Sequence, residues 1–143
     1  MSTRINFYGV SKNGGERLSL GEFSSTDANT FRQYMHIAYD VDTSFTKEDI
    51  NALVDGLQSE IEATKTYLDK AQISLEKLVI MQANSKTIDI YNQIEQSVSN
   101  WKETIHDTIC DIEDKCTIQG RLIAILHFIF ANQEFCNFFY RYA

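Results

Sequence analysis

Apolar side chains recur along the middle of the chain at alternating spacings of four and three residues. The positions are Ile50, Val54, Leu57, Ile61, Thr64, Leu68, Ala71, Leu75, Leu78 and Gln82. A period of about 3.5 residues is typical of a helix that packs lengthwise against another helix. The pattern therefore predicts one long helix that begins at Lys47 and runs to Gln82.

A second series with the same spacing follows after a short polar interruption at residues 83–85. Its positions are Tyr91, Ile94, Val98, Trp101, Ile105, Thr108, Ile112, Cys116 and Gln119. So short a connection makes two helices fold back on each other, which predicts an antiparallel helical hairpin over residues 46–120. Gly120 is expected to end or bend the second helix.

The start of the first long helix carries a local signal. Thr46 can cap the free amide of Asp49, and Phe45 and Ile50 stand at the two positions of a hydrophobic staple. Because Asp49 replaces the usual glutamate of a capping box, we expect the reciprocal hydrogen bond to be weaker.

The amino-terminal part predicts mixed structure. Residues 4–23 contain two apolar stretches around Asn13-Gly14-Gly15, which is typical of a small β-hairpin. Capping residues at 24–27 and apolar residues at helical spacing then predict a short helix over residues 26–39. The expected fold class is therefore mainly α (α+β), in a single domain over residues 1–143.

Residues 121–143 are apolar on nearly every side, which predicts a buried C-terminal helix. The rest of the chain offers little to cover it, so we expect a homo-oligomer, most simply a dimer. The residues expected at the oligomer contact are Phe128, Phe135, Phe138 and Phe139. The alternative is a compact monomer with this helix at its centre.

Composition indicates an intracellular protein. The 143 residues include no proline, which favours long helices, and three cysteines, an odd number without paired spacing. A reducing compartment fits this cysteine content, and with no signal peptide visible after Met1 we expect a cytoplasmic location. The apolar run at residues 122–131 is shorter than the roughly 20 residues of a membrane span, so no membrane contact is predicted.

The charge pattern is the feature with the most functional content. A net charge of −7 argues against direct binding to nucleic acid and favours a basic protein partner. Carboxylates concentrate in residues 40–62 and 103–114, which an antiparallel hairpin brings to the same end. The residues predicted to bind a partner are Glu103, Asp107, Asp111, Asp114, Asp55, Glu60 and Glu62.

Four of these carboxylates follow one helix face at about one turn per step: Glu103, Asp107, Asp111 and Asp114. Neighbouring like charges destabilise a helix slightly, and aspartate near a helix C-terminus opposes the helix dipole. An arrangement that lowers stability invites a functional explanation. The simpler explanation is a solvated face that keeps an acidic protein soluble.

The candidates for chemistry are weak. Glu103 and His106 match one half of a di-iron motif whose second half is absent, and the segment from Asp40 to Asn51 lacks the glycine and glutamate of a calcium loop. Cys110 and His106 can meet on one helix, yet the nearby carboxylates would disfavour the thiolate form that a nucleophile needs. The sequence therefore predicts no enzyme activity, no metal and no cofactor.

These patterns support a non-enzymatic acidic protein that docks on a basic surface of a nucleic-acid-binding enzyme. An inhibitor from a phage or mobile element, of the anti-CRISPR or anti-restriction type and acting as a nucleic-acid mimic in the host cytoplasm, fits the size and charge. One alternative is a structural oligomer built on the heptad seams. The other is a small-ligand (nucleotide) binding protein with a pocket between the β-hairpin and the aromatic C-terminal segment.

Overall fold

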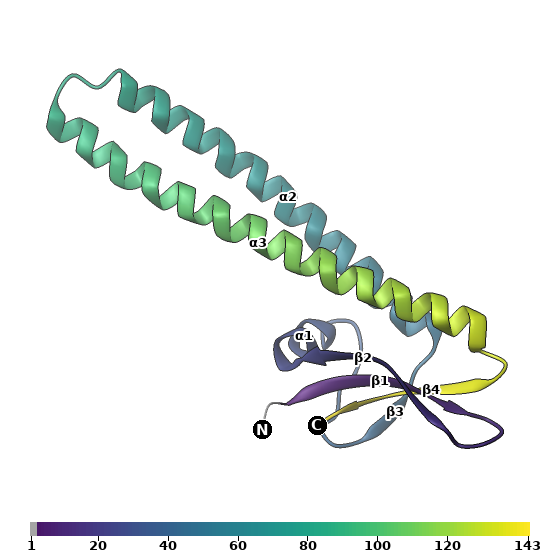
Figure 1. The fold of residues 1–143 in the computed structure, drawn as a ribbon. Helices are drawn as coiled ribbons and strands as arrows, with labels where there is room; N and C mark the ends of the chain where they lie inside the picture. The colour runs from purple at the N-terminus through teal and green to yellow at the C-terminus, as the bar shows by residue number, and fades with distance from the viewer. Residues whose placement is uncertain (1–2) are drawn as a thin grey trace. The chain divides into compact units, whose positions relative to one another are not determined.

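A computed structural model describes residues 3–143. In chain order the elements are β1 (Arg4–Ser11), β2 (Arg17–Ser24), α1 (Ser25–Phe31), β3 (Asp42–Ser44), α2 (Lys47–Ala83), α3 (Ile88–Asn132) and β4 (Cys136–Tyr142) (Figure 1). The fold is mainly helical with an antiparallel sheet, as the sequence predicts. Its contacts divide the chain into two compact units, described separately below as the sheet unit (residues 1–58 and 117–143) and the hairpin unit (Ser59–Cys116).

The sheet unit contains four strands in the order β2-β1-β4-β3, and all three pairings are antiparallel. β1 and β4 form the centre of the sheet, with Ile5 opposite Tyr142 and Ser11 opposite Cys136. The N-terminal and C-terminal strands of the chain are therefore direct neighbours. This arrangement requires the long excursion through α2 and α3 to return to the sheet.

The predicted β-hairpin over residues 4–23 is confirmed as β1 and β2. Gly15 in its turn has a φ of 67°, a left-handed backbone conformation that glycine adopts without steric cost. The register shifts by one residue between Phe7 and Tyr8, so Leu20 is an extra residue in β2. Such a bulge bends the strand and increases its twist.

Aromatic rings from sheet and helices fill the core of the sheet unit. The Phe7 ring lies edge-on to Phe23, at 5.6 Å between centroids, and to Phe45, at 5.3 Å. Phe31 of α1 meets both Phe7 and Phe23. Further buried residues come from the first turns of α2 and the last turns of α3: Ile50, Leu53, Leu57, Leu122, Ile125 and Ile129.

α2 begins at Lys47, as the capping signal predicts. The Asp49 carboxylate accepts a hydrogen bond from the Thr46 backbone N–H at 2.9 Å. This is the reciprocal hydrogen bond of the capping box, from the N-cap backbone to the Asp49 side chain. The sequence predicts it to be weak, but it is present in the structure. All positions of the first predicted seam, from Ile50 to Gln82, are buried or half-buried.

The hairpin unit pairs the remainder of α2 with the first part of α3, running antiparallel (Figure 1). Ile61, Ala71 and Val98 are almost completely buried between the helices. A hydrogen bond from the Gln82 side chain to Glu95 sets the register near the connecting loop. Two predicted seam positions, Tyr91 and Cys116, are instead exposed.

The prediction of a helix over residues 26–39 is wrong in its extent, because α1 ends at Phe31. Tight turns follow, in which the backbone N–H of Tyr34 donates to Phe31. Beyond them the chain runs along β4: the Tyr140 hydroxyl donates to the His36 carbonyl, and Tyr39 forms a bridge with Tyr142. Long-range contacts with the C-terminal strand therefore override the helical periodicity.

The prediction of a separate C-terminal helix over residues 121–143 is also wrong. α3 passes through Gly120 and ends at Asn132, and the chain then forms β4. From Phe138 to Tyr142 every second side chain is buried, which is the period of a strand with one face in a core. Gly120 does not end the helix, because glycine lowers helix propensity by only about 1 kcal/mol.

Two helical glycines provide a test of packing. A Cβ at Gly56 would overlap with the Tyr34 ring, whereas a Cβ at Gly120 would meet no atom within 4 Å. We predict that Gly56→Ala lowers the free energy of unfolding by about 1–2 kcal/mol, because the clash exceeds the gain in helix propensity. Gly120→Ala, the matched control, should raise it by about 0.5–1 kcal/mol. Urea denaturation measures both, and stabilisation by both substitutions would contradict the packing of Tyr34.

Candidate partner-binding face and edge pocket

The acidic ridge, defined as Glu103, Asp107, Asp111 and Asp114, lies on the part of α3 that belongs to the hairpin unit. All four side chains are exposed. Their spacing places them along one side of the helix, as the sequence indicates. Glu60 and Glu62 belong to the same unit, whereas Asp55 belongs to the sheet unit.

Few cations balance this ridge. Asp111 forms an ion pair with Lys115 at 3.0 Å, one turn further along the helix. Within residues 3–143, Glu103, Asp107 and Asp114 take part in no ion pair. The hairpin unit contains eleven carboxylates against six lysines, so it carries −5 of the net charge of −7.

The helix dipole does not strain the ridge, contrary to what the sequence indicates. The sequence suggests that the aspartates lie near a helix C-terminus, but α3 continues from Asp114 to Asn132. The helix dipole acts mainly on the first and last turns, so it does not oppose these charges. Only the mutual repulsion of neighbouring carboxylates remains, at a few tenths of a kcal/mol per pair.

Glu60 is less accessible than the ridge. Its side chain is half-buried, and its Oε2 atom is buried without a hydrogen-bond partner among the described residues. Glu62, two positions further along α2, is exposed. Of the two glutamates, Glu62 is therefore the one that a docking protein can reach directly.

The sulfur and imidazole groups of α3 make one contact. Cys110 Sγ lies 3.8 Å from His106 Nε2, and both side chains are exposed. Over residues 3–143 no group of three or more histidine, cysteine or acidic side chains is arranged to hold a metal ion. Asp40 and Asp42, the start of the rejected calcium loop, both bind the Arg141 guanidinium.

The four phenylalanines predicted at an oligomer contact have different surroundings. Phe138 is buried in the core of its own chain, and the Phe128 ring packs against it at 6.5 Å between centroids. Phe139 is half-buried and stacks on Tyr8, while Phe135 is 60% exposed. Intramolecular packing therefore accounts for most of this aromatic content, and the oligomer stays a prediction.

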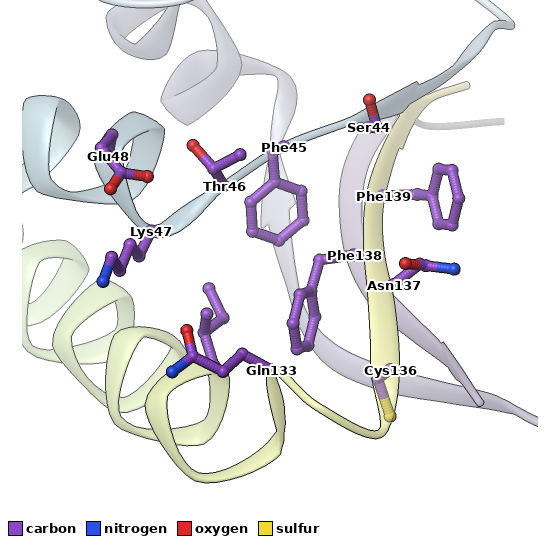
Figure 2. Close-up of a pocket in the computed structure, with 11 residues that line it drawn as sticks. Ser44, Phe45, Thr46, Lys47, Glu48, Gln133, Cys136, Asn137, Phe138 and Phe139 are labelled. Atoms are coloured by element: carbon purple, nitrogen blue, oxygen red, sulfur yellow. The ribbon is translucent and has the colours of Figure 1, made fainter. Parts of the chain in front are cut away.

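A pocket of about 380 Å³ lies within the sheet unit, between the start of α2, the end of α3 and β4 (Figure 2). We call it the edge pocket. The rings of Phe45 and Phe138 face each other across its floor, with Gln133 and Lys47 at the helix side. The sequence indicates a possible pocket between the β-hairpin and the C-terminal segment but not this one, because its pattern predicts a helix where β4 forms.

Lys47 is the cation of the edge pocket. Its Nζ lies 5.1 Å from the centroid of the Phe130 ring, and it forms no ion pair within residues 3–143. Glu48 beside it is held by hydrogen bonds from its own backbone N–H and the Thr46 hydroxyl, which lower the pKa of the carboxyl. The pocket therefore combines an apolar floor with one lysine and one glutamate side chain.

A polar cluster occupies the face of the sheet opposite the aromatic core around Phe7. The Tyr8 hydroxyl donates to Asp42 at 2.6 Å, and the Arg17 guanidinium lies over the Tyr8 ring at 3.7 Å. Burial, then this hydrogen bond, raises the pKa of Tyr8 to about 12. The same hydrogen bond, together with the Arg141 charge, lowers the pKa of Asp42. The cluster ties β1, β3 and β4 together across the sheet.

Comparison with known proteins finds no match to this chain among family models, curated proteins or solved structures. None of the helices within residues 3–143 is long and apolar enough to cross a membrane.

The Tyr8 hydroxyl provides a pH test. Because its pKa in the folded state is above the ordinary value of 10.0, its stabilising effect is complete below pH 10 and is lost as the pH rises towards about 12. We predict that Tyr8 ionises near pH 12 in an ultraviolet absorbance titration, and that Tyr8→Phe removes one tyrosine from the late-titrating group, to which Tyr140 also belongs because burial raises its pKa. In Tyr8→Phe the pKa of Asp42, followed by carboxyl NMR, should rise. Ionisation of every tyrosine near pH 10 would contradict the hydrogen bond.

Proposed function

We propose that this protein is a non-enzymatic binding module whose acidic ridge docks on a basic surface of a protein partner. The observation that carries the proposal is the row of exposed carboxylates on α3, three of which make no ion pair within residues 3–143. Unpaired exposed carboxylates attract a basic partner and can pair with it without first breaking internal ion pairs. The concentration of negative charge in the hairpin unit supports the same docking mode.

The partner we propose is a nucleic-acid-binding effector. Carboxylates one helical turn apart follow each other at about 5 to 6 Å, comparable in scale to the phosphate spacing along a nucleic-acid strand. A basic groove made for phosphates would accept such a row, and the two ligands would compete. An inhibitor encoded by a phage or mobile element, of the anti-CRISPR or anti-restriction type, would act in this way in the host cytoplasm.

The experiment compares two triple variants of equal charge change. The ridge variant is Glu103→Gln, Asp107→Asn and Asp114→Asn. The control neutralises three other acids of the hairpin unit, with Asp69→Asn, Glu76→Gln and Asp89→Asn. The immobilised proteins are incubated with cell lysate, with and without duplex DNA as a competitor, and the captured proteins are quantified by mass spectrometry.

We predict that the wild type and the control capture the same nucleic-acid-binding protein, and that the ridge variant captures about tenfold less of it, because it lacks the charges that pair with the basic groove. Duplex DNA should displace that protein. Circular dichroism of the ridge variant should match that of the wild type. Equal capture by the ridge variant, or equal loss from both variants, would show that the ridge is only a solvated surface.

A further inference from the structure

The edge pocket lies against the free edge of β4 rather than on one of its faces. Successive residues of a strand point to opposite faces of the sheet. Cys136 and Phe138 line the pocket from one face, and Asn137 and Phe139 line it from the other. A cavity lined from both faces must extend around the edge of the strand. Figure 2 shows the open space on the side of β4 that faces α2 and α3.

β4 has no strand partner at this edge because β3 stops too soon. β3 pairs with β4 so that Asp42 lies opposite Arg141. In the same register, the Phe45 N–H donates a hydrogen bond to the Phe138 carbonyl at 3.0 Å. Continuing this register would place residue 47 opposite Cys136. Residue 47 is instead the first residue of α2. The helix start therefore removes the strand that would have covered Cys136.

The backbone of Cys136 points into this gap. In an antiparallel sheet alternate residues direct both their N–H and C=O groups to the same side. The carbonyls of Phe138 and Tyr142 accept hydrogen bonds on the side of β3, from Phe45 and Asp40. Cys136 is in phase with them, so its N–H and C=O face the pocket. An extended chain placed there would satisfy both groups.

The other residues that line the pocket indicate which side chains a bound peptide should have. Ile129, Phe45 and Phe138 form an apolar floor and are almost completely buried by their own neighbours. Lys47 and Glu48 line the pocket together, so its charged rim carries one group of each sign. A volume of about 380 Å³ is at the lower end of the range of ligand pockets, enough for a small fragment of peptide.

We propose that the edge pocket binds an extended peptide segment of a partner protein by adding a short strand to β4 at Cys136. The peptide runs antiparallel to β4, exchanges two backbone hydrogen bonds with Cys136 and places an apolar side chain on Phe45 and Phe138. Strand addition of this kind obtains affinity from the backbone and specificity from side-chain pockets. The proposal concerns the sheet unit and does not depend on the acidic ridge.

The free protein provides the first test. Amide hydrogen exchange followed by NMR should find the Cys136 N–H exchanging at least tenfold faster than that of Asn137, whose N–H faces β1. Equal protection of the two amides would overturn the proposal, because it would mean that Cys136 already has a partner.

The second test is a titration of the full chain with a short capped peptide of alternating valine and aspartate residues, followed by amide NMR. We expect saturable shifts centred on Cys136 and Phe138, and no such shifts with the same peptide methylated on its backbone nitrogens. Gln133→Trp, which fills the pocket, should weaken binding at least tenfold. Glu134→Trp is the control at an exposed neighbour that does not line the pocket.

Three outcomes would overturn the proposal. One is the absence of shifts at these amides with peptide in large excess. Another is equal binding of the methylated peptide, which would indicate a purely apolar site. The third is a concentration-dependent shift of the same amides without peptide, which would show that a second copy of the chain occupies the edge.

Discussion

The pairing of β1 with β4 is the constraint on which the sheet unit depends. It joins the first and last strands of the chain over seven residue pairs, from Ile5 and Tyr142 to Ser11 and Cys136. β4 depends on this pairing most, because its other partner in the described sheet, β3, contains three residues. Such a long-range pairing brings a large loss of chain entropy, which the burial of the aromatic core must offset.

Closure of this sheet explains most of the aromatic residues. Phe7 on β1 meets rings from β2, from α1 and from Phe45 between β3 and α2, and Tyr140 on β4 completes the cluster at 5.8 Å from Phe7. On the opposite face, one hydrogen bond from Tyr8 to Asp42 connects β1 and β3 across the intervening β4. The two faces of the sheet thus hold the same strands together by different interactions, apolar packing on one and a charged cluster on the other.

The two proposed sites have different physical origins. The acidic ridge follows from helical periodicity alone, because residues four apart on a helix lie on one side. It was therefore predictable from the spacing of Glu103, Asp107 and Asp111, although the helix dipole argument failed once α3 proved to continue to Asn132. The edge pocket exists because α2 begins at Lys47 while β4 continues to Cys136. No local pattern describes that mismatch, since its two sides are far apart in the sequence.

Three features follow from the sequence by itself because local interactions determine them. They are the β-hairpin with its glycine turn, the start of α2 at Lys47 and the seam from Ile50 to Gln82. Their signals lie within a few residues of each other, in capping groups, turn residues and period. The conformation of residues 32–39 and of the C-terminal segment was decided by tertiary structure. Residues 136–142 form a strand because alternate residues find backbone hydrogen-bond partners on β1, while Phe138, Tyr140 and Tyr142 bury their side chains in the core. A run rich in aromatic residues satisfies either helix or strand periodicity until its partner is known, and here the partner lies at the opposite end of the chain.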